Sequence, residues 1–185
     1  MPEPQTPPVY NLLEAHPTAI VIQCSDPRFQ KAFRDFTANE LHLRDGEYIP
    51  FVISGGVAAL AEPLKLPKEF KFIKERIELF TGLFKSINRV VLINHEDCRH
   101  YDMLKSTLGS IFLQHAAHMT DRQIKDLRGV AKMVMDFVAP GFKLEAYYAR
   151  IVRNGTATVP AESATAHVGA TKRSDGAATV VFEKV

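Results

Sequence analysis

Two short apolar segments, each followed at once by reactive side chains, constrain the fold of this chain more than any other feature. Residues 19–23 (AIVIQ) lead into residues 24–28 (CSDPR), and residues 90–94 (VVLIN) lead into residues 95–98 (HEDC). Short runs rich in β-branched residues that end in polar groups are typical of buried parallel strands. In open α/β sheets, ligands bind just beyond the carboxyl ends of such strands. We therefore expect both cysteines of the chain to lie where ligands usually bind.

The cysteines Cys24 and Cys98 and the histidine His95 form a Cys2His ligand set, the type that holds a catalytic zinc ion with a fourth position open. A lone buried cysteine is usually a small core residue, so the argument depends on the combination. His-x-x-Cys lets two ligands converge from one turn, and the third comes from a neighbouring strand end. A disulfide is the alternative, but a reducing compartment argues against it. Two thiolates and an imidazole predict zinc in tetrahedral geometry.

Asp26 and Arg28 share a short loop with Cys24. One interpretation is a surface ion pair, which contributes little to stability. The functional interpretation is that Arg28 keeps Asp26 ionised and oriented beside the metal. An extended loop, which Pro27 favours, would bring Cys24, Asp26 and Arg28 to one side. Asp26 would then accept a hydrogen bond from zinc-bound water or hydroxide, or ligate the metal itself.

Length and composition predict one globular domain without a nucleic-acid or membrane partner. The chain has 185 residues, 46% of them hydrophobic, and a net charge of only +2 without a basic run. No apolar stretch approaches the roughly 20 residues of a membrane-spanning helix. The N-terminus lacks the pattern of a signal peptide, so we expect a cytoplasmic protein. We divide the chain into an arm over residues 1–15, with a short helix over 9–15, and a single zinc-binding α/β domain over 16–185.

Hydrophobic periodicity and turn signals predict alternating strands and helices. Strands are expected over residues 20–23, 48–53, 90–94, 142–152 and 179–183. Helices are expected over residues 29–40, from 58 toward 66, and over 68–84, 101–118 and 121–137. Pro50 indicates an edge position for the second strand. Two adjacent glycines, Gly55 and Gly56, follow that strand, which indicates positive φ angles or close backbone approach. Residues 153–176 show no periodicity and are expected to form a long surface loop.

Two other sites that use similar residues do not fit this sequence. A phosphate loop with a cysteine nucleophile needs a longer Cys-to-Arg spacing and small residues between them, which residues 24–28 lack. A dinucleotide site needs Gly-x-Gly-x-x-Gly, which is absent from the sequence. The metal site remains the leading hypothesis.

The pair of motifs Cys24-x-Asp26-x-Arg28 and His95-x-x-Cys98 resembles the β-class carbonic anhydrases. The resemblance covers most of residues 16–98, including residues 54–56 (SGG) after the second strand, and the remainder of the chain more loosely. It implies a mostly parallel α/β sheet flanked by helices, a homodimer or larger homo-oligomer, and zinc held by Cys24, His95 and Cys98. It also implies that Asp26 and Arg28 are catalytic.

The family's reaction is the reversible hydration of carbon dioxide to bicarbonate by zinc-bound hydroxide, a lyase reaction. Val52 and Ile53 stand where family members usually carry Arg-Asn, and Arg99 stands where they carry glycine. Three interpretations therefore remain open: an active carbonic anhydrase, a zinc hydrolase of the same fold acting on another small substrate, and a zinc-stabilised protein without catalysis.

Overall fold

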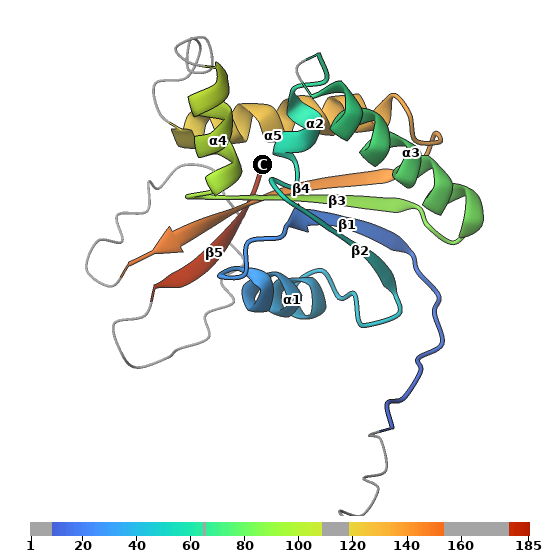
Figure 1. Cartoon of the computed structure of the whole chain (residues 1–185). Coiled ribbons are helices and arrows are strands. Elements are labelled where there is room, and N and C mark those ends of the chain that lie inside the picture. The colour runs from blue at the N-terminus through green and yellow to red at the C-terminus, as the bar shows by residue number, and fades with distance from the viewer. Residues whose placement is uncertain (1–8, 65, 109–118, 154–177) are drawn as a thin grey trace, which may run out of the picture.

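The computed structural model describes residues 9–64, 66–108, 119–153 and 178–185, and its centre is a five-stranded sheet with helices on both faces (Figure 1). The strands are β1 (Ala19–Cys24), β2 (Tyr48–Ile53), β3 (Arg89–His95), β4 (Lys143–Val152) and β5 (Thr179–Lys184). Their order is β2-β1-β3-β4-β5. All neighbouring pairs are parallel except β4 and β5, which are antiparallel. The expected mostly parallel sheet flanked by helices is confirmed.

The two central strands are the ones that carry the reactive motifs. Strand β1 is buried along its whole length, and β3 is buried from Val90 to His95. Continuous burial is what parallel strands covered on both faces require, and it explains why these segments lack polar alternation. The pairing of Ile22 with Leu92 aligns the two strands, so Cys24 and His95 end them at the same edge of the sheet.

The helices cover the two faces unequally. Helix α1 (Gln30–Asn39) lies on one face, and α2 (Ala58–Ala61), α3 (Pro67–Leu83), α4 (Arg99–Leu108) and α5 (Met119–Met135) lie on the other (Figure 1). These helices confirm the expected ones within a few residues. The part of the expected helix over 101–118 that follows Leu108, and most of the expected loop over 153–176, lie outside the described residues.

Two apolar clusters hold the helices to the sheet. On the α1 face, Phe33 and Phe36 pack with Val91 and Ile93 of β3. On the other face, the buried cluster joins residues of α2, α3 and α5 to the sheet: Leu60, Ile73, Ile77, Leu127, Val130, Val134, Ile20, Ile22 and Leu92. These amphipathic faces explain why the helical periodicity could be read from the sequence.

Two expectations for local structure are wrong. Residues 9–18 form no helix, because apolar side chains such as Val9 and Leu12 are 91% and 99% exposed, and a helix this short needs packing to be stable. The loop after Cys24 is not extended: a turn over residues 27–29 leads directly into α1. The backbone N–H of Arg28 donates to Oδ1 of Asp26 at 3.0 Å, which favours this turn.

The expectations for the edge of the sheet are confirmed. Strand β2 is one of the two edge strands, and its Pro50 is exposed. Gly55 and Gly56 adopt φ angles of 77° and 50° in the turn that follows. None of the helices in the described ranges has the length and apolar character needed to cross a membrane.

Candidate metal centre

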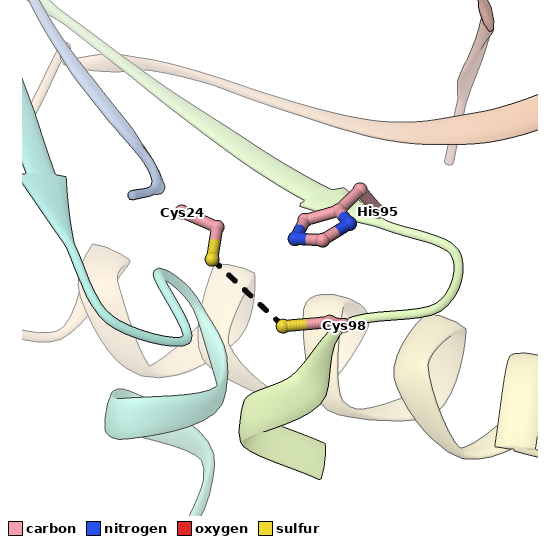
Figure 2. Close-up of side chains that lie close together, drawn as sticks. All are labelled: Cys24, His95 and Cys98. Atoms are coloured by element: carbon pink, nitrogen blue, oxygen red, sulfur yellow. Dashed lines mark hydrogen bonds between the residues drawn. The ribbon is translucent and has the colours of Figure 1, made fainter. Parts of the chain in front are cut away.

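Three side chains from two strand ends converge at the carboxyl edge of the sheet. Cys24 is the last residue of β1, His95 is the last residue of β3, and Cys98 immediately precedes α4 (Figure 2). Their potential ligand atoms all lie within 4.8 Å of one another, and all three residues are buried. The structure therefore brings together the three residues that the sequence predicted as metal ligands.

The spacing of the donor atoms fits a tetrahedral zinc ion. Two sulfurs that each lie about 2.3 Å from zinc at a tetrahedral angle are about 3.8 Å apart. The Sγ atoms of Cys24 and Cys98 are 3.8 Å apart. The Nε2 atom of His95 is buried and has no hydrogen-bond partner in the described part of the chain. Such an unpaired atom is costly unless it binds something, and a metal ion is the partner that suits this donor set.

The backbone fixes the orientation of the His95 ring. Nδ1 lies 2.8 Å from the carbonyl oxygen of Glu96, an arrangement in which the Nδ1–H donates and Nε2 keeps its lone pair. The ring of Phe29 packs against the imidazole with centroids 4.2 Å apart. The hydrogen bond and the aromatic contact together turn Nε2 toward the two sulfurs (Figure 2).

The two thiols influence each other strongly in the absence of a cation. The hydrogen bond with Cys98 lowers the pKa of Cys24, and the same bond, together with burial, raises the pKa of Cys98. One thiolate therefore forms readily, whereas a second buried negative charge beside it is unfavourable. A divalent cation removes this conflict, because it is attracted to both thiolates.

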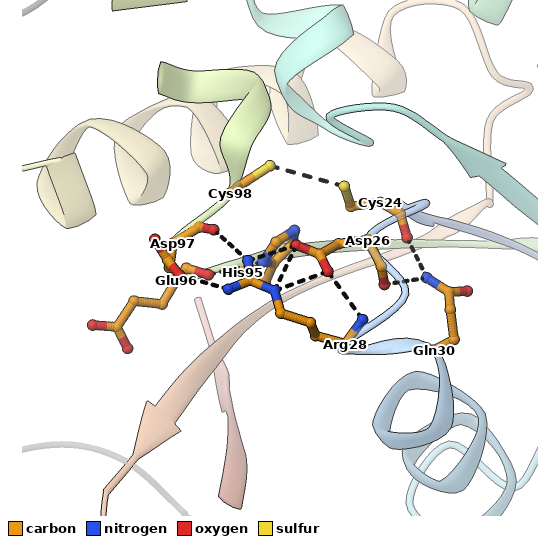
Figure 3. Close-up of polar contacts among 8 residues, drawn as sticks. All are labelled: Cys24, Asp26, Arg28, Gln30, His95, Glu96, Asp97 and Cys98. Carbon is orange, nitrogen blue, oxygen red and sulfur yellow. Dashed lines mark hydrogen bonds and ion pairs between the residues drawn. The ribbon is translucent and has the colours of Figure 1, made fainter. Parts of the chain in front are cut away.

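Asp26 and Arg28 form a close ion pair beside the three converging side chains (Figure 3). Arg28 donates from Nη2 to Oδ2 of Asp26 at 2.7 Å and from Nε to Oδ1 at 3.1 Å. These hydrogen bonds lower the pKa of Asp26 despite its burial, and they raise that of Arg28. The predicted pairing is present, although a turn produces it and not the extended loop that we expected.

Three residues that were not singled out in the sequence support the site. Asp97 forms a second ion pair with Arg28. Gln30 donates from Nε2 to the carbonyl oxygens of Cys24 and Asp26, both at 2.8 Å. Glu96 accepts the backbone N–H of Ile151 at 2.8 Å. The signal for Asp97 and Glu96 was their place inside the His-x-x-Cys motif, whereas Gln30 looked like an ordinary polar residue at a helix start.

Two cavities border the centre. The smaller, of about 330 Å³, is lined by the loop from Cys24 to Arg28, by Ser54 and Gly55, and by Cys98, Arg99 and His100. The larger, of about 490 Å³, is lined by residues 96–98 and by residues of α4, α5 and β4. Only the smaller one is lined by Cys24, Asp26 and Arg28, so it is the better candidate for a reaction pocket.

Comparison with known proteins gives a fold similarity at low identity. No protein-family model and no curated protein matches the chain. Among solved structures, β-carbonic anhydrase isoform I from Trichomonas vaginalis is similar, with 11% identity, 96% of this chain and 90% of that chain covered, and a TM-score of 0.49. A tetrameric β-carbonic anhydrase from Sordaria macrospora has 13% identity, coverage of 74% and 77%, and a TM-score of 0.43. A carbonic anhydrase from Streptococcus mutans has 13% identity, coverage of 78% and 82%, and a TM-score of 0.41. The chain is thus similar in fold, at low identity, to carbonic anhydrases of the β class.

Proposed function

We propose that this protein is a zinc enzyme that catalyses the reversible hydration of carbon dioxide to bicarbonate. The observation that carries the proposal is the convergence of Cys24, His95 and Cys98 beside the Asp26–Arg28 pair. We infer the substrate, carbon dioxide, from the resemblance of the two motifs to those of the β-class carbonic anhydrases. Residues 16–185 would then act as a single zinc-binding domain.

The metal would be held by the two thiolates and by Nε2 of His95. A zinc ion in such a site supplies a Lewis acid, which lowers the pKa of a coordinated water to about 7. Two thiolates balance the charge of Zn²⁺, so the centre gains no excess charge when all three residues bind. Because only three side chains of the described residues converge there, a fourth position is left for water or substrate.

Asp26 and Arg28 are proposed to orient the attacking water. The carboxylate of Asp26 is mostly buried, and Arg28 keeps it ionised, so it is a hydrogen-bond acceptor with a fixed direction. Arg28 cannot lose its proton at neutral pH, so it acts as a permanent anchor. Arg99, at the wall of the 330 Å³ cavity, adds a positive charge that suits an anionic product.

We further propose that the protein is a cytoplasmic homodimer or larger homo-oligomer. Large apolar side chains on and after α3, such as Phe72 and Leu83, are exposed in the single chain, and β2 presents an open sheet edge. Both cysteines are free thiols, which a reducing compartment maintains.

The experiment is stopped-flow hydration of carbon dioxide with the zinc-loaded protein, with zinc content measured on the same sample. We expect one zinc per chain and a rate above that of the buffer. Cys98→Ser should lose both stoichiometric zinc and the rate, because two ligands do not hold the metal tightly. Full zinc occupancy in Cys98→Ser would refute the ligand assignment.

A zinc-loaded wild type without any rate above buffer would instead refute the hydration reaction. The result would then favour another small substrate or a zinc site that only stabilises the fold. A rise in the thermal unfolding temperature on zinc loading, in the absence of hydration, would support the stabilising role.

A further inference from the structure

Arg28 is shared between two carboxylates from different loops. Besides its bonds to Asp26, it donates from Nη1 to Oδ2 of Asp97 at 2.7 Å and from Nη2 to the carbonyl oxygen of Asp97 at 2.8 Å (Figure 3). Asp26 follows Cys24 in the loop after β1, and Asp97 lies between His95 and Cys98 in the loop after β3. One guanidinium therefore links the two loops that carry the three converging side chains.

The backbone of Asp97 is adapted to this contact. Its φ angle is 57°, in the left-handed region that costs energy for most residues but that aspartate and asparagine tolerate. In this conformation both the carboxylate and the carbonyl oxygen of Asp97 accept hydrogen bonds from Arg28. The planar guanidinium suits such a two-point contact, because its donors are held in a fixed fork.

The contact between Arg28 and Asp97 lies where it can affect the geometry of the candidate metal centre. Arg28 lines the 330 Å³ cavity, Asp97 lines the 490 Å³ cavity, and Cys98 borders both. The contact thus lies between the two cavities, next to a predicted metal ligand. The side chains of Arg28 and Asp97 are 46% and 53% exposed, so the pair contributes little to global stability. Its effect is expected on local geometry.

We propose that Asp97 is a positioning residue, which holds Arg28 across the two loops and so keeps Cys24, His95 and Cys98 at metal-binding spacing. The inference rests on the proposed zinc site. In it, Asp97 affects metal binding indirectly, through Arg28. Asp97 also holds Arg28 in the orientation in which it binds Asp26.

The first test measures the rate at which the zinc-loaded protein loses zinc to an excess of a chromogenic chelator. The decisive variant is Asp97→Gly, because glycine adopts positive φ freely and removes only the side chain. We expect zinc loss to become about tenfold faster, as is common when a residue that orients metal ligands is removed. Asp97→Asn should be intermediate, since it tolerates the same backbone angle and keeps one acceptor oxygen.

A purely structural role for residue 97 predicts the opposite order. Glycine would then relieve backbone strain and retain zinc at least as well as the wild type. Asp35→Asn is the matched control, because it removes an aspartate from an exposed ion pair with Lys31 on α1. It should leave zinc loss unchanged, and none of these variants should shift the thermal unfolding temperature of the metal-free protein by more than a few degrees.

A double-mutant cycle tests whether Asp97 acts through Arg28. If it does, Arg28→Gln combined with Asp97→Gly should lose zinc no faster than Arg28→Gln alone. Additive effects of the two changes would overturn the proposal, as would a wild-type rate in Asp97→Gly.

The second test uses metal-free full-length protein and the thiol reagent DTNB. The buried Cys24 and Cys98 should react faster in Asp97→Gly than in the wild type if the loops separate, because a buried thiol reacts through local opening. This measurement is independent of zinc binding and of hydration. An unchanged thiol reaction would overturn the positioning role even if the protein were an active enzyme, and a faster reaction would support it even if hydration were absent.

Discussion

Asp26 lies beside the three converging side chains without belonging to them, which makes its proposed role separable from metal binding. Arg28 donates to Asp26 from two nitrogens, and the pair shares its cavity with Cys24 and Cys98. A residue that orients the attacking water should affect the rate while the zinc content stays constant. This distinction defines the experiment at the residue scale.

We predict that Asp26→Ala keeps one zinc per chain and lowers the hydration rate about 100-fold, the typical contribution of a positioned acid or base. Arg28→Ala should also lower the rate, because Asp26 then lacks the partner that holds it away from the metal. The measurement is stopped-flow hydration against pH, with zinc analysis of each variant. Wild-type rates in fully zinc-loaded Asp26→Ala would show that the pair has no catalytic role.

Gly56 is a second residue on which the site depends. A Cβ atom built there would lie 2.8 Å from the backbone nitrogen of Cys24 and 3.0 Å from the backbone carbon of Gln23. The close approach of the turn after β2 to the end of β1 is therefore possible only without a side chain. Any substitution would move the backbone that carries Cys24.

We predict that Gly56→Ala destabilises the protein by about 2 kcal/mol or more and weakens zinc binding, because both strain and a backbone clash result. Gly141→Ala is the control: it has a φ angle of 94°, but its Cβ would meet no atom within 4 Å. The control should cost only about 1 kcal/mol and leave zinc binding unchanged. Denaturant unfolding and zinc content measure the two effects. Equal losses of stability and of zinc binding in the two variants would argue against a backbone clash at Gly56.

At the scale of elements, a buried carboxylate on β4 links this strand to β3. Glu145 of β4 has a side chain that is only 4% exposed, and it accepts hydrogen bonds from Arg89 Nε and from the hydroxyl of Tyr147, both at 2.6 Å. Lys143 Nζ lies 3.2 Å away. Burial raises the pKa of Glu145, but these partners outweigh it and lower the pKa to about 2.

This shift predicts a loss of stability in acid. Because the folded pKa of about 2 lies below the ordinary value of 4.5, the ionised carboxylate stabilises the fold above pH 4.5, and this contribution is lost as the pH falls toward 2. Glu145→Gln should destabilise the protein by about 3 kcal/mol at neutral pH. The difference between variant and wild type should shrink as the pH falls through this range, as measured by urea unfolding.

Glu183→Gln is the matched control on β5. Glu183 pairs with Arg150, and both side chains are more than a third exposed. Its replacement should therefore cost less than about 1 kcal/mol. If Glu145→Gln were no more destabilising than this control, the buried carboxylate would not be important for the pairing of β3 with β4.

At the scale of the whole molecule, the sheet is open, with β2 at one edge and β5 at the other. Strand β2 pairs with β1 on one side and has no neighbour on its other side among the described residues. Near this edge, Phe51 of β2 packs against Phe72 of α3, which is itself 47% exposed. An open edge beside apolar side chains is a surface that proteins usually cover.

We predict a mass of at least twice the chain mass of 20.7 kDa by light scattering at micromolar concentration. Charge at an apolar contact is unfavourable, so the combination of Phe72→Lys and Leu83→Lys should lower the mass. Lys71→Glu and Glu75→Lys together form the control, since they exchange the charges of an exposed pair on the same helix. A monomeric wild type would contradict the prediction.

The sequence by itself determined the alternation of strands and helices, because period-2, period-3.6 and continuous apolar patterns are local properties of a chain. It also determined the three residues that converge, since motifs at the ends of buried strands must share one edge of a parallel sheet. Residues 9–15 were predicted wrongly as a helix, because the stability of so short a helix depends on contacts that its own sequence does not show.

Only the tertiary structure decided which distant residues contact the segments that carry the three converging side chains. Asp97 and Arg28 are separated by 69 residues, and Gly56 approaches the backbone of Cys24 from the turn after β2. Ion pairs and close backbone contacts between distant segments depend on the relative placement of whole elements, about which local patterns carry no information. The residues that could bind the metal were visible in the sequence, whereas the residues that we propose to keep the two sulfurs 3.8 Å apart became visible only in three dimensions.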